Sequence, residues 1–197
     1  MKYFLVVMLL VSLYVACSDD DSSPQAKQPV VYCAGEIVIG TKSAAAWWKD
    51  GVLQQSLTDG TNQACANAIA VSGPDVFVAG YENSSGVPVA KYWKNGVASS
   101  LTIGGAQPAI LGGIAVSDGN VYAAGYESNG SKRVAKYWKN GTGVALTDGT
   151  TDAWAAALAL SGTNVHIVGY EETAGGVRVA MYWKNGVRIP LTDGTRQ

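Results

Sequence analysis

Very few side chains in this sequence are suited to acid–base or metal chemistry. His166 is the only histidine in 197 residues, and it occupies a repeated position that holds Tyr32, Phe77 and Tyr122 elsewhere. Because there is no second histidine to share a zinc ion or a proton, we interpret His166 as a packed substitute for these aromatic residues. We therefore expect no metal site, no cofactor and no catalytic group.

Two cysteines, Cys33 and Cys65, remain when Cys17 near the N-terminus is set aside. Their positions hold apolar residues in the other copies of the repeat, so we expect them to be buried like small apolar side chains. An exported protein can also oxidise its thiols, and adjacent strands could bring these two within bonding distance. A disulfide between Cys33 and Cys65 is therefore the alternative prediction.

Tyrosine followed by glutamate recurs near the end of one predicted strand in three copies. The turns of an antiparallel meander alternate between its two ends, so the turns after these pairs share one end with the "LTDG" turns. Exposed aromatic residues beside polar loops are typical of glycan or protein recognition. We predict a ligand-facing surface made of Tyr81, Glu82, Tyr126, Glu127, Tyr170 and Glu171.

Simpler roles are also open to these residues. The tyrosines could pack between sheets, and the turn acids Asp59, Asp148 and Asp193 could bind only backbone N–H groups of their own turns. The opposite end receives the turns that contain Lys49, Lys94, Lys139 and Lys184. The sequence therefore predicts one acidic end and one basic end.

A repeat with a period of 45 residues organises the chain. Trp48, Trp93, Trp138 and Trp183 are each 45 residues apart. Leucines that open "LTDG" or "LTIG" and glycines within "AGE", "AGY" and "VGY" keep the same phase, at Leu57, Leu101, Leu146, Leu191 and at Gly35, Gly80, Gly125, Gly169. Three markers in step define a structural unit.

Each full copy reads as four short strands. In one copy these are residues 112–119, 120–127, 133–138 and 143–147. The last two are joined by Asn140-Gly141, the strongest short hairpin signal. Each period is therefore predicted to be a four-stranded antiparallel meander.

Such sheets must stack on one another to bury their faces. The small residues of the first two strands suit the crowded inside of a stack, and the Tyr-Trp pairs of the third strand suit its wider outside. The taper and the period indicate an all-β, β-propeller-like array of about three and three-quarter blades. The alternatives are a stacked β-meander that never closes and an open β-solenoid, which ranks lower because its period is usually shorter. The repeats are roughly 30–63, 64–108, 109–152 and 153–197.

Residues 30–197 resemble kelch and HAF-type repeats in layout, with differences. Where kelch repeats have a Gly-Gly pair, this chain has Ala79-Gly80, Ala124-Gly125 and Val168-Gly169. The first copy begins at its second strand, because a polar segment stands where the innermost strand would be. We interpret the array either as a piece of a longer propeller or as a four-blade ring that lacks one inner strand.

The N-terminal segment has the features of an export signal. A lysine, an apolar run from residue 3 to residue 15 and the pair Ala16-Cys17 resemble a bacterial lipoprotein signal, although Tyr14 replaces the usual leucine. The resemblance implies that residues 1–16 are removed and that Cys17 is lipidated; an ordinary signal peptide is the alternative. Residues 17–29, with three consecutive aspartates, form an acidic flexible tether that resembles the export signal of surface lipoproteins; a generic acidic linker is the alternative.

The sequence thus favours a lipoprotein anchored through Cys17 at the bacterial outer membrane, exposed on the cell surface, that binds a glycan or a protein. A formal net charge of −1 gives no reason to expect a nucleic acid partner. An extracellular carbohydrate-active enzyme or its remnant, with a site in the central funnel, is the first alternative. It would depend on the charged residues outside the repeat pattern: Glu36, Asp152, Glu172, Arg133 and Arg178. A purely structural surface protein is the second alternative.

Overall fold

Short strands and tight turns make up the regular structure of this chain. The computed structural model describes residues 29–102 and 107–195, and within these ranges there are fifteen strands and no helix. The strands are β1 (Tyr32–Ile39), β2 (Lys42–Lys49), β3 (Val52–Ser56), β4 (Ala64–Ser72), β5 (Asp75–Ser84), β6 (Val87–Lys94), β7 (Val97–Ser100), β8 (Ala109–Ser117), β9 (Asn120–Ser128), β10 (Arg133–Lys139), β11 (Thr142–Ala145), β12 (Ala153–Ser161), β13 (Asn164–Glu172), β14 (Arg178–Lys184) and β15 (Val187–Pro190).

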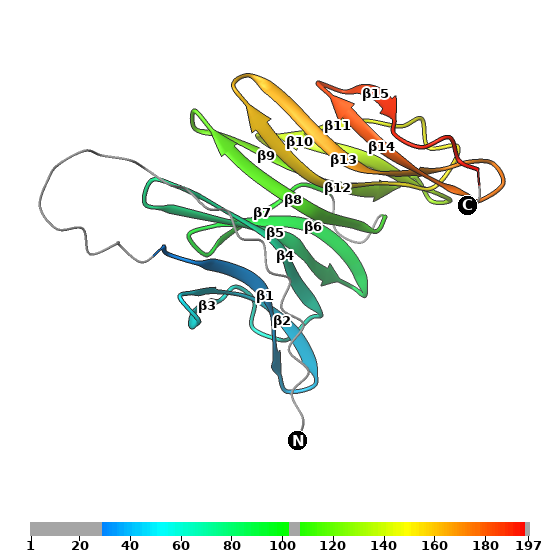
Figure 1. The fold of residues 1–197 in the computed structure, drawn as a ribbon. Helices are drawn as coiled ribbons and strands as arrows, with labels where there is room; N and C mark the ends of the chain where they lie inside the picture. The colour runs from blue at the N-terminus through cyan, green and yellow to red at the C-terminus, as the bar shows by residue number, and fades with distance from the viewer. Residues whose placement is uncertain (1–28, 103–106, 196–197) are drawn as a thin grey trace, which may run out of the picture.

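These strands form four antiparallel sheets that follow one another along the chain (Figure 1). The first sheet has three strands, β1-β2-β3, and the other three are the four-stranded meanders β4-β5-β6-β7, β8-β9-β10-β11 and β12-β13-β14-β15. The predicted four-stranded unit is confirmed. The first copy does lack the innermost strand, so one edge of β1 has no partner strand among the described residues.

The first strand of the third sheet is longer than the sequence pattern indicated. It begins at Ala109, three residues before the predicted start at Gly112. The register of β8 against β9 shifts between Leu111 and Gly113, and pairing then continues to Ala109 opposite Glu127. A bulge interrupts the alternation of side chains, which is why the pattern revealed only the regular part of the strand.

The repeated Asn-Gly pairs make the turns between third and fourth strands. Asn140 has φ 48° and Gly141 has φ 87°, so both residues of the turn have positive φ, as type I′ hairpins require. The Asn140 side-chain Oδ1 also accepts a hydrogen bond from the backbone N–H of Val121, at 2.9 Å. The repeated asparagine therefore fixes the turn and ties it to the start of the second strand.

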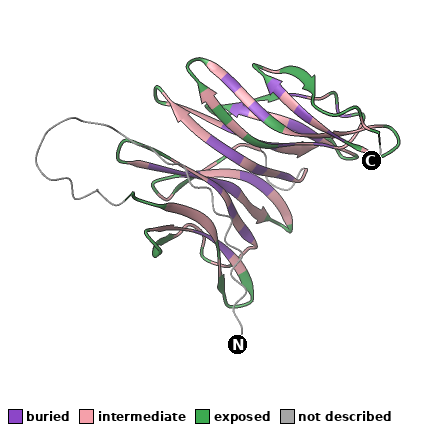
Figure 2. Ribbon diagram, in the orientation of Figure 1, coloured by how far each residue is buried: buried purple, intermediate pink, exposed green. Residues whose placement is uncertain are grey.

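The apolar core lies between the sheets. Trp93, Trp138 and Trp183 are at most 2% exposed. Each tryptophan belongs to a cluster with a fully buried alanine of the preceding sheet, Ala45, Ala90 and Ala135 respectively. Buried segments accordingly fall along the strands where neighbouring sheets face each other (Figure 2). A bulky residue facing a small one in every layer produces the regular stack.

The first strands β4, β8 and β12 occupy the centre of the array. β8 contacts both β4 and β12, and β4 contacts β1 of the sheet before it. The substantial contacts between sheets join only sheets that are consecutive in the chain, and the first and last sheets lie at opposite ends of the array (Figure 1). The ring is therefore open.

The open ring leaves one face of the last sheet uncovered. Leu146 in the third sheet is 7% exposed, whereas Leu191 at the equivalent position of the last sheet is 59% exposed. Ala124 is fully buried, and its counterpart Val168 is 46% exposed. In the first three sheets, this face packs against the tryptophan of the following sheet. In the last sheet, the same face is accessible to solvent.

The N-terminal predictions lie outside the described residues. They are the signal peptide, the lipidated Cys17 and the tether as far as residue 28. Among the residues that are described, no helix has the length and apolar character needed to cross a membrane.

Candidate functional site

The predicted ligand-facing tyrosines and glutamates lie on opposite faces of their strands. Successive side chains of a strand point to opposite faces, so Tyr126 and Glu127 of β9 are separated by the sheet itself. Tyr126 faces the next sheet, where its ring meets the Trp154 ring edge to face at a centroid distance of 6.1 Å. The pairs therefore do not form one surface, and the tyrosines and the glutamates have different roles.

The glutamates form ion pairs within their own sheets. Glu82 contacts Lys91 and Glu127 contacts Lys136, each at 2.5 Å, and Glu171 contacts Nε of Arg188 at 2.7 Å. These carboxylates are 14–28% exposed at the side chain. Each glutamate is thus neutralised by a basic neighbour of its own sheet.

The aspartates of the "LTDG" turns bind groups of their own turns. Asp59 Oδ1 accepts hydrogen bonds from the hydroxyl and the backbone N–H of Thr61, and both hold the pKa of Asp59 below its ordinary value. Asp148 and Asp193 make the same contacts with Thr150 and Thr195. Hydrogen bonds from neutral threonines lower the pKa of these three aspartates without cancelling their charge, so the turns hold them as charged carboxylates.

Basic side chains at the opposite end are also engaged. Lys94 pairs with Asp75 at 2.8 Å and lies 5.3 Å above the centroid of the Phe77 ring. Lys139 lies 5.3 Å above the ring of Tyr122. The Asp75 carboxylate thus neutralises Lys94, whereas contact with an aromatic ring leaves the charge of Lys139 in place.

Arginine and aromatic side chains gather at one end of the third and fourth sheets. The Cζ atom of Arg133, at the start of β10, lies 5.9 Å from the ring centroids of both Tyr126 and Tyr170. The Cζ atom of Arg178, at the start of β14, lies 4.3 Å from the Tyr170 ring. We call Tyr126, Arg133, Trp154, Tyr170 and Arg178 the tyrosine–arginine patch.

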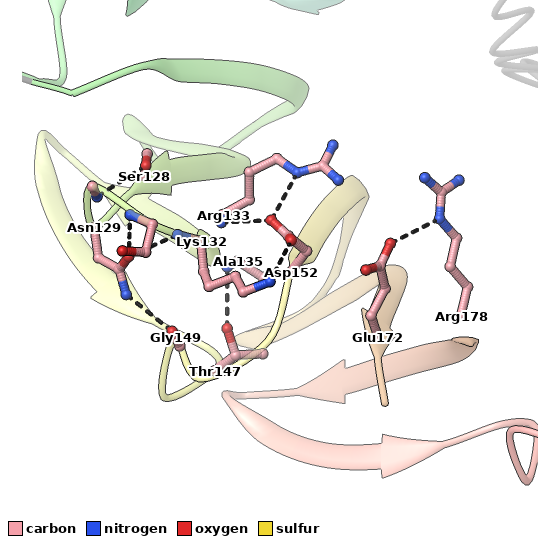
Figure 3. A network of polar contacts seen from close by, with 12 residues as sticks. Ser128, Asn129, Lys132, Arg133, Ala135, Thr147, Gly149, Asp152, Glu172 and Arg178 are labelled. Carbon is pink, nitrogen blue, oxygen red and sulfur yellow. Dashed lines mark hydrogen bonds and ion pairs between the residues drawn. The ribbon is translucent and has the colours of Figure 1, made fainter. Parts of the chain in front are cut away.

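Carboxylates hold both arginines in place (Figure 3). Asp152 Oδ1 accepts hydrogen bonds from the backbone N–H and from Nε of Arg133, at 2.9 and 3.3 Å, and its Oδ2 contacts Lys132 at 3.2 Å. The backbone N–H of Arg133 and the two basic side chains lower the pKa of Asp152, which is therefore charged at neutral pH. Glu172 Oε1 accepts a hydrogen bond from Nε of Arg178 at 3.4 Å.

Tyr126 of the patch is neutral at physiological pH. Burial raises the pKa of Tyr126, and burial likewise raises that of Tyr81, which lies at the equivalent position of the second sheet. Two buried donors of the patch, the Tyr170 hydroxyl and the Trp154 indole Nε1, have no hydrogen-bond partner among the described residues. Buried donors without partners are uncommon in folded proteins.

His166 packs as an aromatic residue. Its ring stacks on Tyr182 with centroids 5.9 Å apart, and its Nδ1 lies 2.6 Å from the Tyr182 hydroxyl. In the two described ranges, no group of three or more histidine, cysteine, aspartate or glutamate side chains is placed to hold a metal ion.

Cys33 and Cys65 are free thiols, so the disulfide that the sequence allows is not formed. Tyr32 and Ala34 of β1 pack toward the second sheet, and alternation directs Cys33 between them to the other face. Cys65 lies in the second sheet, where its thiol is 3.3 Å from Oδ1 of Asn67. Burial, with a smaller contribution from the Glu36 carboxylate, raises the pKa of Cys65 to about 12.

The central strands line a groove of about 500 Å³. Its walls come from β4, β8 and β12 and consist of small or apolar residues, with Ser117 as the one hydroxyl among the lining side chains. Acid–base chemistry needs titratable groups, and this lining supplies none. The enzyme alternative depends on five charged residues outside this groove. Arg133 and Arg178 belong to the patch, and Asp152 and Glu172 pair with them. The fifth, Glu36, lies beside Cys65.

From the sequence, Arg133 and Arg178 were recognised as charged residues outside the repeat pattern, but their contacts with the tyrosines were not predicted. The signal was available, because their position holds Ser43 and Pro88 in the first two copies. Trp154 was missed altogether; its counterparts are Cys65 and Ile110.

Comparisons with known proteins bear on the fold alone. No protein-family model matches the chain, and no curated protein matches it. Among solved structures it is similar to the β-propeller domain of the Trilobed protease from Pyrococcus furiosus, at 15% sequence identity and a TM-score of 0.52. The match covers 85% of this chain and 53% of that one, so this chain spans about half of that chain's length. That domain is described as having an open velcro topology. Together with the stacked four-stranded meanders, the similarity shows a β-propeller-like fold with an unclosed ring.

Proposed function

We propose that this protein is a lipid-anchored, surface-exposed binding module, with no enzymatic activity, that presents the tyrosine–arginine patch to its ligand. The observation that carries the proposal is the position of Arg133 and Arg178. They share one position of the repeat, which the first two copies fill with Ser43 and Pro88, and both lie against tyrosine rings at the same end of neighbouring sheets. Arginine and tyrosine are enriched at the centres of binding surfaces, whereas residues that only maintain a repeat are expected in every copy.

A binding screen with the full chain in detergent tests the module. An array of glycans and extracellular proteins is probed with the native chain and with R133A and R178A, and each bound glycan is then analysed for cleavage products. We expect binding without turnover, and weaker binding by both variants. Cleaved products would favour the carbohydrate-active enzyme instead, and silence across the array would favour a purely structural protein.

The lipid anchor has its own test. Cells that produce the chain are labelled with a clickable fatty acid, and the labelled protein is compared with C17S. We expect label only on the native chain, and we expect protease added to intact cells to digest it. Equal labelling of C17S would contradict the anchor while leaving the binding surface unaffected.

A further inference from the structure

Both arginines of the patch have N–H donors that no acceptor among the described residues engages. A guanidinium carries five N–H donors in a planar fork. In the described part of the chain, the only side-chain hydrogen bond of Arg133 runs from Nε to Asp152, and the only one of Arg178 runs from Nε to Glu172. The terminal nitrogens of both groups are therefore available to a ligand.

The two forks are held before any ligand arrives. Each has its Nε bonded to a carboxylate and its plane near a tyrosine ring, at 4.3 Å for Arg178. Contacts of this kind reduce the conformational freedom that an arginine loses on binding. The side chains are still 34% and 62% exposed for Arg133 and Arg178, so a ligand can reach them. Figure 3 shows both guanidinium groups projecting beyond the carboxylates that hold them.

The local charge favours an anion. The basic groups are Lys132, Arg133 and Arg178, and the acidic groups paired with them are Asp152 and Glu172. Three cations against two carboxylates leave one positive charge in excess. A carboxylate or a sulfate can accept two parallel N–H donors from an arginine, which gives the strongest class of hydrogen bond in water-exposed sites.

We propose that the ligand of the patch is an acidic polysaccharide, whose carboxylate or sulfate group is bound by the terminal nitrogens of Arg133 and Arg178. The inference rests on the proposed function, because it takes the patch to be the ligand surface. A sugar chain is the favoured carrier of the oxyanion since partly exposed aromatic side chains, Tyr126 and Trp154, lie beside the arginines and offer apolar area to a sugar ring.

Oligosaccharides that differ only in charge provide the test. The full chain in detergent is titrated with an oligomer of galacturonic acid, with its methyl ester and with a heparin-derived oligosaccharide. We expect the methyl ester to bind at least about 10-fold more weakly than the free acid or the sulfated sugar, because it lacks the oxyanion. Affinity for the acidic sugars should fall as salt is raised. Whichever acidic sugar binds identifies the oxyanion.

Matched variants locate the site. R133Q and R178Q should each weaken binding of the acidic sugar about 10-fold or more, and R178K, which keeps the charge without the fork, should also weaken it. R188Q is the control, since Arg188 is an exposed arginine of the same sheet that pairs with Glu171 outside the patch. It should bind as the native chain does. Thermal unfolding of every variant shows whether the fold is kept.

Three results would overturn the inference. They are equal binding of the ester and the free acid, binding that R133Q and R178Q leave unchanged, and stronger binding of poly-glutamate, titrated in the same assay, than of any acidic sugar. A neutral glycan whose binding is lost on R133A or R178A would refute the acidic ligand while the proposed binding function stands. If nothing on the array binds, the proposed binding function and the acidic ligand are both refuted.

Discussion

At the scale of single residues, most of the repeated polar side chains form hydrogen bonds within their own sheet. Asn95, Asn140 and Asn185 each accept a hydrogen bond from the backbone N–H of the second residue of β5, β9 or β13, and Asp50 accepts one from the residue just before β1. The threonines of the "LT" pairs accept one from an alanine of the third strand, as Thr147 does from Ala135. These residues recur because each copy needs the same hydrogen bonds, so their recurrence indicates structure and not a ligand.

Two substitutions of Asn140 test how much its side chain contributes to stability. N140A should lower the free energy of unfolding by about 1–2 kcal/mol, because it removes two hydrogen bonds and places alanine at positive φ. N140D should cost less than about 0.5 kcal/mol, since aspartate makes the same acceptor contact at position 50. Urea denaturation gives both values. Equal stability of the two variants would mean that the acceptor does not matter.

The partly buried thiol of Cys65 should be slow to alkylate. Its pKa of about 12 keeps it protonated at pH 8, whereas the ordinary thiol, with a pKa near 9.0, is partly ionised there. Iodoacetamide labelling followed by peptide mass spectrometry should therefore modify Cys65 at least about 10-fold faster in denaturant than in the folded chain. E36Q should speed labelling of the folded form, since it removes a negative charge that opposes the thiolate. A folded-state rate as fast as in denaturant would contradict the buried environment.

At the scale of the strand, close approach of two backbones requires glycine in the second strand of each complete sheet. A Cβ on Gly125 would overlap the carbonyl oxygen of Ile110 in β8, next to the bulge, and Gly80 and Gly169 face Cys65 and Trp154 in the same way. The first sheet has no innermost strand. There a Cβ on Gly35 would instead lie 3.3 Å from a ring carbon of Trp48.

The glycine of the third sheet and that of the first are therefore a matched pair. G125A should lower the free energy of unfolding by about 2–3 kcal/mol because the backbone of β8 must move, whereas G35A should lower it by less than about 1 kcal/mol. Chemical denaturation of the two variants measures the difference. Similar losses would show that some other contact determines the need for glycine.

At the scale of the whole molecule, burial of equivalent residues depends on where the stack ends. The sequence around Leu146 nearly repeats around Leu191, and both open "LTDGT". Leu146 belongs to the core between the third and fourth sheets, whereas Leu191 has no following sheet in the described residues. Position in the array, and not residue type, decides which leucine stabilises the fold.

Truncating each leucine tests that conclusion. L146A should cost about 2–3 kcal/mol of folding free energy, as expected for a buried leucine that leaves a cavity. L191A should change it by less than about 0.5 kcal/mol. The measurement is made by denaturant unfolding in dilute solution. A comparable loss for L191A would mean that another surface covers the last sheet, and a higher protein concentration would then reveal self-association.

The sequence by itself determined the architecture of the repeat. The spacing of Trp93 and Trp138, the Asn-Gly turns and the polar segment in place of a first strand were sufficient to predict stacked four-stranded meanders with one strand missing. Such features are local and periodic, and strand alternation and turn chemistry can be read over a few residues. The bulge at Leu111 was not predicted, since it breaks the alternation that the prediction depends on.

Only the tertiary structure decided which polar residues are free. The tyrosine and glutamate of each "YE" pair are adjacent in the sequence, but the strand directs them to opposite faces, where Glu127 meets Lys136 and Tyr126 meets Trp154. Arg133 and Arg178 are 45 residues apart, and stacking of the third and fourth sheets brings both to Tyr170. Contacts between sheets depend on how the faces pack, which a periodic pattern does not encode.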